Sequence, residues 1–168
     1  MKKLILVLVA VMMVIMASPI SAEEKTSTVK YEVTEEYEWQ VHDGIDFGQN
    51  AGPLGQTVDK DALISSQTNG VAVTKNRIAE NKKLSIKIAS ANDFHVVSGG
   101  QSLAYTVSKG DAVGEPLAQH AEVLAVLAGT NAGAQPLHFQ LTTTSNTAEV
   151  VGVYNDSLTY TAEIISAN

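Results

Sequence analysis

The most regular feature of the chain is the alternation of apolar and polar residues with a period of two. From Val29 to Val41 the large apolar side chains fall at odd positions, and most even positions are polar. This pattern predicts a β-strand with one face on a core and the other in water. One unbroken strand of this length would span roughly 43 Å at about 3.3 Å per residue, too long for a small domain. We therefore predict a break or bulge at Glu35-Glu36.

The same alternation recurs further along the chain. It predicts a short strand at Ile45–Phe47 and further strands at Val71–Val73, Leu84–Ile88, Phe94–Val96, Leu103–Val107, Leu137–Leu141 and Leu158–Ile164. Gly99-Gly100 lies between two of these segments and predicts a tight hairpin. Asp59–Ser65 is compatible with a helical turn capped by Asp59. Val123–Leu127 is apolar on both faces and fits either a central strand or a buried helical turn.

The number and spacing of these segments indicate an all-β fold. Eight or nine short strands separated by turn-forming residues are typical of an immunoglobulin-like antiparallel β-sandwich with Greek-key connections. A polar linker, Thr142–Glu149, precedes the last strand.

The first 22 residues have a different pattern. Two lysines precede an apolar run, Leu4–Ala17, and small residues follow up to Ala22. This order is typical of a secretory signal peptide, with cleavage expected between Ala22 and Glu23 and Ala17 as a second candidate site. A membrane-spanning helix needs about 20 apolar residues, whereas this run is shorter and ends near Pro19. We therefore expect a signal peptide at 1–22, and a single exported domain at 23–168.

Charge and composition narrow the range of partners. Without the signal peptide the chain has nine basic and eighteen acidic residues, a formal net charge of −9. An acidic chain without a basic stripe is a poor candidate for binding nucleic acid or anionic lipid. Cysteine is absent from the sequence, so no disulfide can stabilise the domain. With no second long apolar run, we expect no stable membrane span after signal removal.

Both ends of the expected domain resemble a known group of proteins. Thr28–Val33 followed by Tyr37–Val41 resembles the opening strand of small secreted surface proteins from Gram-positive bacteria, mostly Firmicutes. Gly152–Thr161 resembles their final strand, G-x-Y-x-D-x-L-x-(Y/F)-T, which also recurs in spore-coat-U and fimbrial subunits with an immunoglobulin-like sandwich. Many members carry Ile-Pro after the opening strand, where this chain has Val41-His42-Asp43.

The resemblance implies an extracellular or cell-surface structural role and no catalytic residues. The residues that carry the fold motif are Tyr31, Trp39, Gly152, Tyr154 and Asp156. Glycine permits a tight entry into the last strand, and a tyrosine can bury its ring while its hydroxyl reaches the backbone.

Residues capable of metal or acid–base chemistry are scattered along the sequence. The histidines are His42, His95, His120 and His138, none with a partner at metal-ligand spacing. Calcium is the least implausible metal, because Asp43/Asp46 and Asp59/Asp61 offer oxygen ligands, but neither pair matches an EF-hand loop. Turn formation and capping explain these aspartates more simply. We expect no cofactor and no bound metal.

A catalytic site is not expected either. Ser98-Gly99-Gly100 lacks the G-x-S-x-G context of a serine hydrolase and fits a hairpin turn better. Carboxylates such as Glu35-Glu36 could be brought together by folding, yet surface charge at strand ends is the simpler explanation.

Aromatic side chains could form a sugar-binding platform. Tyr31, Tyr37 and Trp39 share one face of the predicted first strand, but that face is the core side, so we expect burial. Tyr105, Tyr154 and Tyr160 are expected in the core for the same reason.

Together these features favour a non-enzymatic exported protein of the cell surface, matrix or fibre-forming type, with a carbohydrate- or protein-binding adhesin module as the alternative. The expected partners are a cell-wall or surface protein, a glycan, or further copies of the chain. Glu23–Val33 could pair with the sheet of a neighbouring molecule by β-augmentation. Pairing within its own domain is the favoured interpretation, because sequential strands usually pair locally.

Overall fold

The computed structural model describes residues 27–48, 57–61, 63–65, 68–142 and 151–167. The predicted signal peptide and the Ala22/Glu23 cleavage site lie outside these residues, as does most of the linker Thr142–Glu149. Contacts divide the chain into two units, Met1–Glu32 and Val33–Asn168, which are described separately.

The described part of the second unit consists of strands and connecting turns, without a helix, so the predicted all-β class is confirmed. Its strands are β1 Glu36–Val41, β2 Val58–Asp61, β3 Leu63–Ser65, β4 Thr68–Asn69, β5 Val71–Arg77, β6 Lys82–Ser90, β7 His95–Ser98, β8 Gln101–Lys109, β9 Ala121–Leu127, β10 Gly133–Gln135, β11 Leu137–Leu141 and β12 Leu158–Ser166. The described strands outnumber the eight or nine predicted, because several are only two to four residues long.

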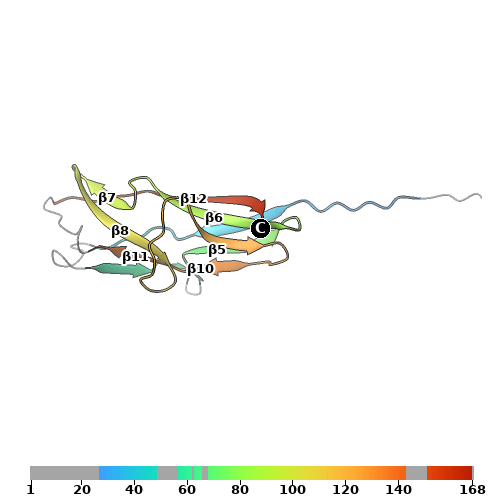
Figure 1. Ribbon diagram of the computed structural model, residues 1–168, viewed down its shortest axis with the longest axis horizontal. Helices are drawn as coiled ribbons and strands as arrows, with labels where there is room; N and C mark the ends of the chain where they lie inside the picture. Colours follow the sequence, from blue (N-terminus) through green and yellow to red (C-terminus); the bar gives the residue numbers. More distant parts are fainter. Residues whose placement is uncertain (1–26, 49–56, 62, 66–67, 143–150, 168) are drawn as a thin grey trace, which may run out of the picture. The chain divides into compact units, whose positions relative to one another are not determined.

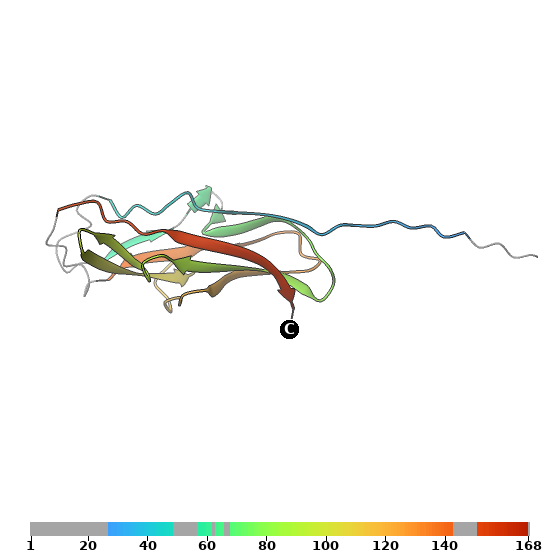
Figure 2. The ribbon, with the colours of Figure 1, turned by 90° about the horizontal axis from the view of Figure 1, so that it is seen from above.

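The strands form three antiparallel sheets and a short two-stranded ladder. The sheet orders are β1-β5-β10, β2-β11-β8-β7 and β12-β6-β9, and β3 pairs with β4. Figure 1 shows β12 and β6 on one side of a sandwich-like arrangement, with β5 and β10 on the other. Figure 2, seen from above, shows β12 in red running along this unit to the carboxyl end.

A single hydrophobic cluster joins the three sheets. β6 follows the sequence pattern on its core face, where Leu84, Ile86 and Ile88 are fully buried; of the two residues between them, Lys87 is partly exposed and Ser85 is buried. Strand alternation places every second side chain on the same face, so one apolar row supplies the core. Phe139 of β11 and Tyr105 of β8 belong to the same cluster.

The β7–β8 hairpin is confirmed in its details. Ser98 pairs with Gln101, and only Gly99 and Gly100 lie between them. Their φ angles of 55° and 83° are left-handed. Two successive left-handed residues are what a tight two-residue hairpin turn requires, and glycine adopts this conformation without strain.

Three local predictions are corrected. The helical turn at Asp59–Ser65 is wrong, because these residues contribute to β2 and β3. Ile45–Phe47 is not a strand, although Ile45 and Phe47 still pack against the core. Val123–Leu127 belongs to a strand, β9, which lies at the edge of its sheet and not at the centre.

The long alternating run Val29–Val41 is divided near the predicted point. β1 begins at Glu36, and its pairing with β5 shifts register between Glu38 and Trp39. Residues 27–35 lie outside every strand that the structure describes. The alternating pattern therefore predicted a strand correctly only in the part of the segment that pairs with β5.

Candidate functional site

The most densely hydrogen-bonded side chain in the described structure is Asp156, which lies just before β12. Its Oδ2 accepts hydrogen bonds from the hydroxyls of Ser90 (2.6 Å) and Tyr105 (2.5 Å). Its Oδ1 accepts from the backbone and side-chain nitrogens of Asn92 (3.1 and 3.0 Å) and from the backbone nitrogen of Ser157 (2.8 Å). One carboxylate thus joins the end of β6, strand β8 and the start of β12.

The electrostatics of this cluster favour a charged Asp156. Burial alone raises the pKa of a carboxyl group, but the hydrogen bonds from Ser90, Tyr105 and the backbone outweigh it, so the pKa of Asp156 is lowered. Burial, together with Asp156, raises the pKa of Tyr105. An acceptor that is ionised at neutral pH and surrounded by donors stabilises the fold and is poorly suited to take up or release a proton there.

A second polar contact lies inside the core. His42, which follows β1, is buried, and its Nε2 lies 2.8 Å from the hydroxyl of Tyr160 on β12. Its ring meets the rings of Tyr160 and Phe139 edge-on. Burial lowers the pKa of His42, against smaller opposing contributions from the Gly44 backbone and the Asp43 charge. A neutral histidine that fills core volume is a structural element.

A third cluster joins β2 to β11. His138 is buried, and its Nδ1 lies 2.9 Å from Oδ1 of Asp61, while its Nε2 lies 3.9 Å from Oδ1 of Asp59. Sequence spacing gave no sign of this cluster, because the histidine and the aspartates are more than 75 residues apart.

The other two histidines lie outside these clusters: His95 contacts the backbone oxygen of Asp93, and His120 is exposed. In the described part of the chain, no three His, Cys, Asp or Glu side chains converge as metal ligands.

The four most exposed large apolar side chains of the described residues lie in two segments of the sequence. Val29 and Tyr31 belong to the first unit, with exposed fractions of 94% and 88%, and Val33 is half-exposed. Val151 and Val153 are exposed beside Asn155, which pairs with Val97 on the edge strand β7. These two groups mark surfaces suited to contact with another molecule.

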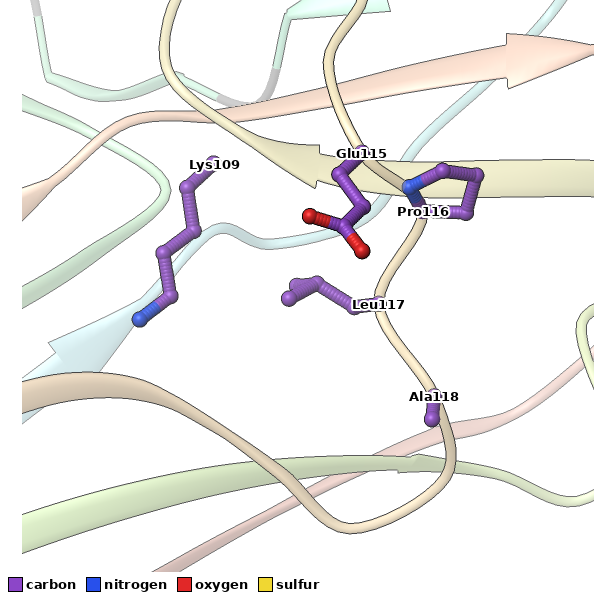
Figure 3. A pocket seen from close by; sticks show the side chains of 5 residues that line it. All are labelled: Lys109, Glu115, Pro116, Leu117 and Ala118. Carbon is purple, nitrogen blue, oxygen red and sulfur yellow. The ribbon is translucent and has the colours of Figure 1, made fainter.

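Two surface hollows in the described structure are open to solvent and are lined by few titratable side chains. One, of about 410 Å³, is lined by Lys109, Pro116, Leu117 and Ala118 with a single carboxylate, Glu115. Figure 3 shows Lys109 set apart from Glu115 and Leu117. Glycoside cleavage needs two carboxylates, so the residues lining this hollow do not provide that chemistry. A second hollow includes Lys75 and Arg77, whose charges are engaged by Glu36.

The motif residues and the aromatic residues expected in the core differ in burial and in contacts. Trp39 and Tyr154 pack against the core as expected, and Tyr105 is fully part of it. The burial expected for Tyr31 and Tyr37 is wrong, because both side chains are exposed. Gly152 lies close to the β7–β8 hairpin, and a Cβ there would approach Ser98 Oγ to 2.8 Å, so a larger residue would require the Ser98 side chain to move. The role of Asp156 as a hydrogen-bonding centre was not visible from the motif.

Comparison with known proteins adds no family. No protein-family model matches the chain, and no curated protein matches it. Within the described residues, no helix is long and apolar enough to cross a membrane.

Proposed function

We propose that this chain is an exported, non-enzymatic protein that acts by contact, as a cell-surface, matrix or fibre-forming component. The observation that carries the proposal is residues 27–35, which lie outside every described strand yet keep strand-like alternation. Val29 and Tyr31 are almost fully exposed, and Lys30 and Glu32, which alternate with them, form an ion pair. An extended segment with one apolar row and one polar row is suited to pair with the edge of another molecule's sheet.

The same proposal includes a finer fold. An immunoglobulin-like sandwich with Greek-key connections is consistent with three antiparallel sheets around one core. The two end motifs and the signal-like leader support an exported protein of the Gram-positive surface type. Its partners are then a wall or surface protein, a glycan, or further copies of the chain.

Donation of the amino-terminal segment to a neighbouring copy is the specific form of this proposal. Pairing within the domain was the favoured sequence-based interpretation. Because residues 27–35 belong to no described strand, we now favour donation.

Electron microscopy combined with size measurement in solution tests the proposal on protein expressed from the complete sequence, with its processed N-terminus determined by mass spectrometry. We expect cleavage after Ala22 and fibres or higher oligomers. A Val29→Ser/Tyr31→Ser variant removes the apolar row and is expected to abolish assembly. Lys30→Ser/Glu32→Ser is the matched control on the polar row and is expected to assemble.

Two results would contradict this proposal. Fibres formed by a variant lacking residues 23–33 would exclude donation. A strict monomer that is enriched on glycans or wall polymers would instead favour the adhesin module.

A further inference from the structure

The edge strand β2 is joined to β11 by two polar cross-strand pairs. His138 lies directly opposite Asp61, and Gln140 lies opposite Asp59. Directly opposed residues of an antiparallel pair project from the same face, so these four side chains form one cluster. Gln140 Nε2 lies 2.8 Å from Asp59 Oδ1, which sets the side-chain amide of Gln140 beside that carboxylate.

The imidazole of His138 has one satisfied nitrogen and one unsatisfied nitrogen. Nδ1 faces Asp61, and since a carboxylate only accepts, Nδ1 carries the ring hydrogen whenever the imidazole is neutral. Nε2 then holds a lone pair, is buried, and has no hydrogen-bond partner. The carboxylate it faces at 3.9 Å, that of Asp59, cannot donate to it. Two electron-rich atoms facing each other at this distance suit a positively charged group between them.

We propose that a divalent transition cation of the zinc type binds between His138 Nε2 and the Asp59 carboxylate. Zinc–nitrogen and zinc–oxygen bonds are both about 2.0–2.2 Å long, so one ion can bind both atoms across the 3.9 Å gap when the half-exposed Asp59 side chain moves about half an ångström toward His138, as tetrahedral coordination requires. Gln140 now donates through Nε2 to Asp59 Oδ1, and it becomes a third ligand only by giving up that hydrogen bond and turning its amide oxygen toward the ion, with water completing the coordination. The site uses only two residues of the usual ligand types, which is consistent with the absence of a three-residue acidic or histidine cluster among the described residues.

Asp61 has the position of an outer-shell residue. Metal-binding histidines commonly donate their other ring N–H to a carboxylate, which fixes the tautomer and orients the ring. Asp61 does this at 2.9 Å. The side chains of Asp59 and Asp61 are half-exposed, so the ion reaches the buried histidine from the solvent side.

The choice of a zinc-type ion over calcium follows from the ligands. Calcium takes six to eight oxygen ligands, whereas an imidazole nitrogen with carboxylate oxygen suits zinc, nickel or copper. Bound there, the ion cross-links the four-residue edge strand β2 to the centre of its sheet.

Titration calorimetry with zinc chloride tests the site on protein expressed from the complete sequence. We expect one zinc ion per chain. Asp59→Asn preserves size and lies on a half-exposed side chain, so it should fold while weakening zinc binding at least tenfold. His138→Gln should abolish binding, and Asp61→Asn should weaken it about tenfold. His95→Gln and Asp43→Asn are the controls and should bind as the parent does.

Nitrogen NMR of the histidine ring provides a second readout that does not depend on variants. Zinc should shift the His138 Nε2 resonance and leave that of His95 unchanged. The proposal is overturned by the absence of stoichiometric zinc binding, by binding that Asp59→Asn leaves intact, or by a His138 Nε2 resonance that does not respond to zinc.

Discussion

Two polar sites hold strand β12 in place, and they do so with opposite electrostatics. Just before the strand, Asp156 is kept charged by hydrogen bonds from Ser90, Tyr105 and the backbone. Within the strand, Tyr160 meets His42, which burial keeps neutral. The first site stabilises an ion by surrounding it with donors, and the second excludes an ion by removing it from water.

The two sites differ in the number of hydrogen-bond partners, and this number determines how strongly the loss of one partner affects stability. Asp156 has several donors, so the loss of one leaves the carboxylate well satisfied. His42 Nε2 has the Tyr160 hydroxyl as its described side-chain partner, so the loss of that hydroxyl leaves a buried nitrogen unpaired. Removal of the Asp156 carboxylate, the shared acceptor, should therefore lower the free energy of unfolding strongly at the first site. At the second site, removal of the Tyr160 hydroxyl alone should already lower it.

Replacement of the shared acceptor is expected to have the largest effect. Asp156→Ala leaves Ser90, Tyr105 and the Asn92 side chain without their common partner. Hydrogen bonds to a charged group contribute about 1.5–3 kcal/mol each and are not additive, so we expect unfolding free energy to fall by about 2–4 kcal/mol. Urea-induced unfolding of the variant and the parent protein measures this change in the free energy of unfolding. Asp111→Ala, an exposed carboxylate on the loop after β8, should change stability by less than about 0.5 kcal/mol. Equal losses in both variants would refute the role of the cluster.

Removal of one hydroxyl at each site should give unequal effects. Tyr160→Phe leaves the buried His42 nitrogen unsatisfied, so we expect a loss of about 1–3 kcal/mol. Tyr105→Phe removes one of several donors to Asp156 and should cost about 1 kcal/mol or less. The same urea experiment decides, and a larger loss for Tyr105→Phe would reverse the proposed contrast.

Elements that depend on a local sequence pattern could be predicted from the sequence. Leu84–Ile88 and the Gly99-Gly100 hairpin were predictable because alternation and left-handed turn residues act over a few positions. The β2 strand was missed because its two aspartates look like a turn, although pairing with β11 makes them cross-strand partners. The Asp156 cluster was identified only as part of a motif, since Ser90 and Tyr105 lie 66 and 51 residues away.

Acidification should destabilise both sites, in two separate ranges of pH. The folded pKa of His42 is lowered from 6.5, so its contribution is present above pH 6.5 and is lost as the pH falls through the folded pKa. The folded pKa of Asp156 is lowered from 3.8, so its contribution persists above that value and is lost as the pH falls through the folded pKa. Unfolding free energy measured against pH should decline in two steps. Replacement of His42 by Gln should remove the upper step, and a retained upper step in that variant would assign it to another group.

The smallest effect is expected where the alternating pattern has no described strand partner. Tyr31 and Trp39 occupy equivalent positions in the pattern, yet Tyr31 is exposed while Trp39 packs against the core. Tyr31→Ser should therefore leave the stability of the dilute monomer unchanged within about 0.5 kcal/mol. Trp39→Ala should cost about 2–4 kcal/mol, less than a fully buried tryptophan because the side chain is only partly covered. Unfolding measured at low protein concentration separates this effect from assembly. A large loss for Tyr31→Ser under those conditions would mean that the segment is bound within its own molecule, which would count directly against donation to a neighbour.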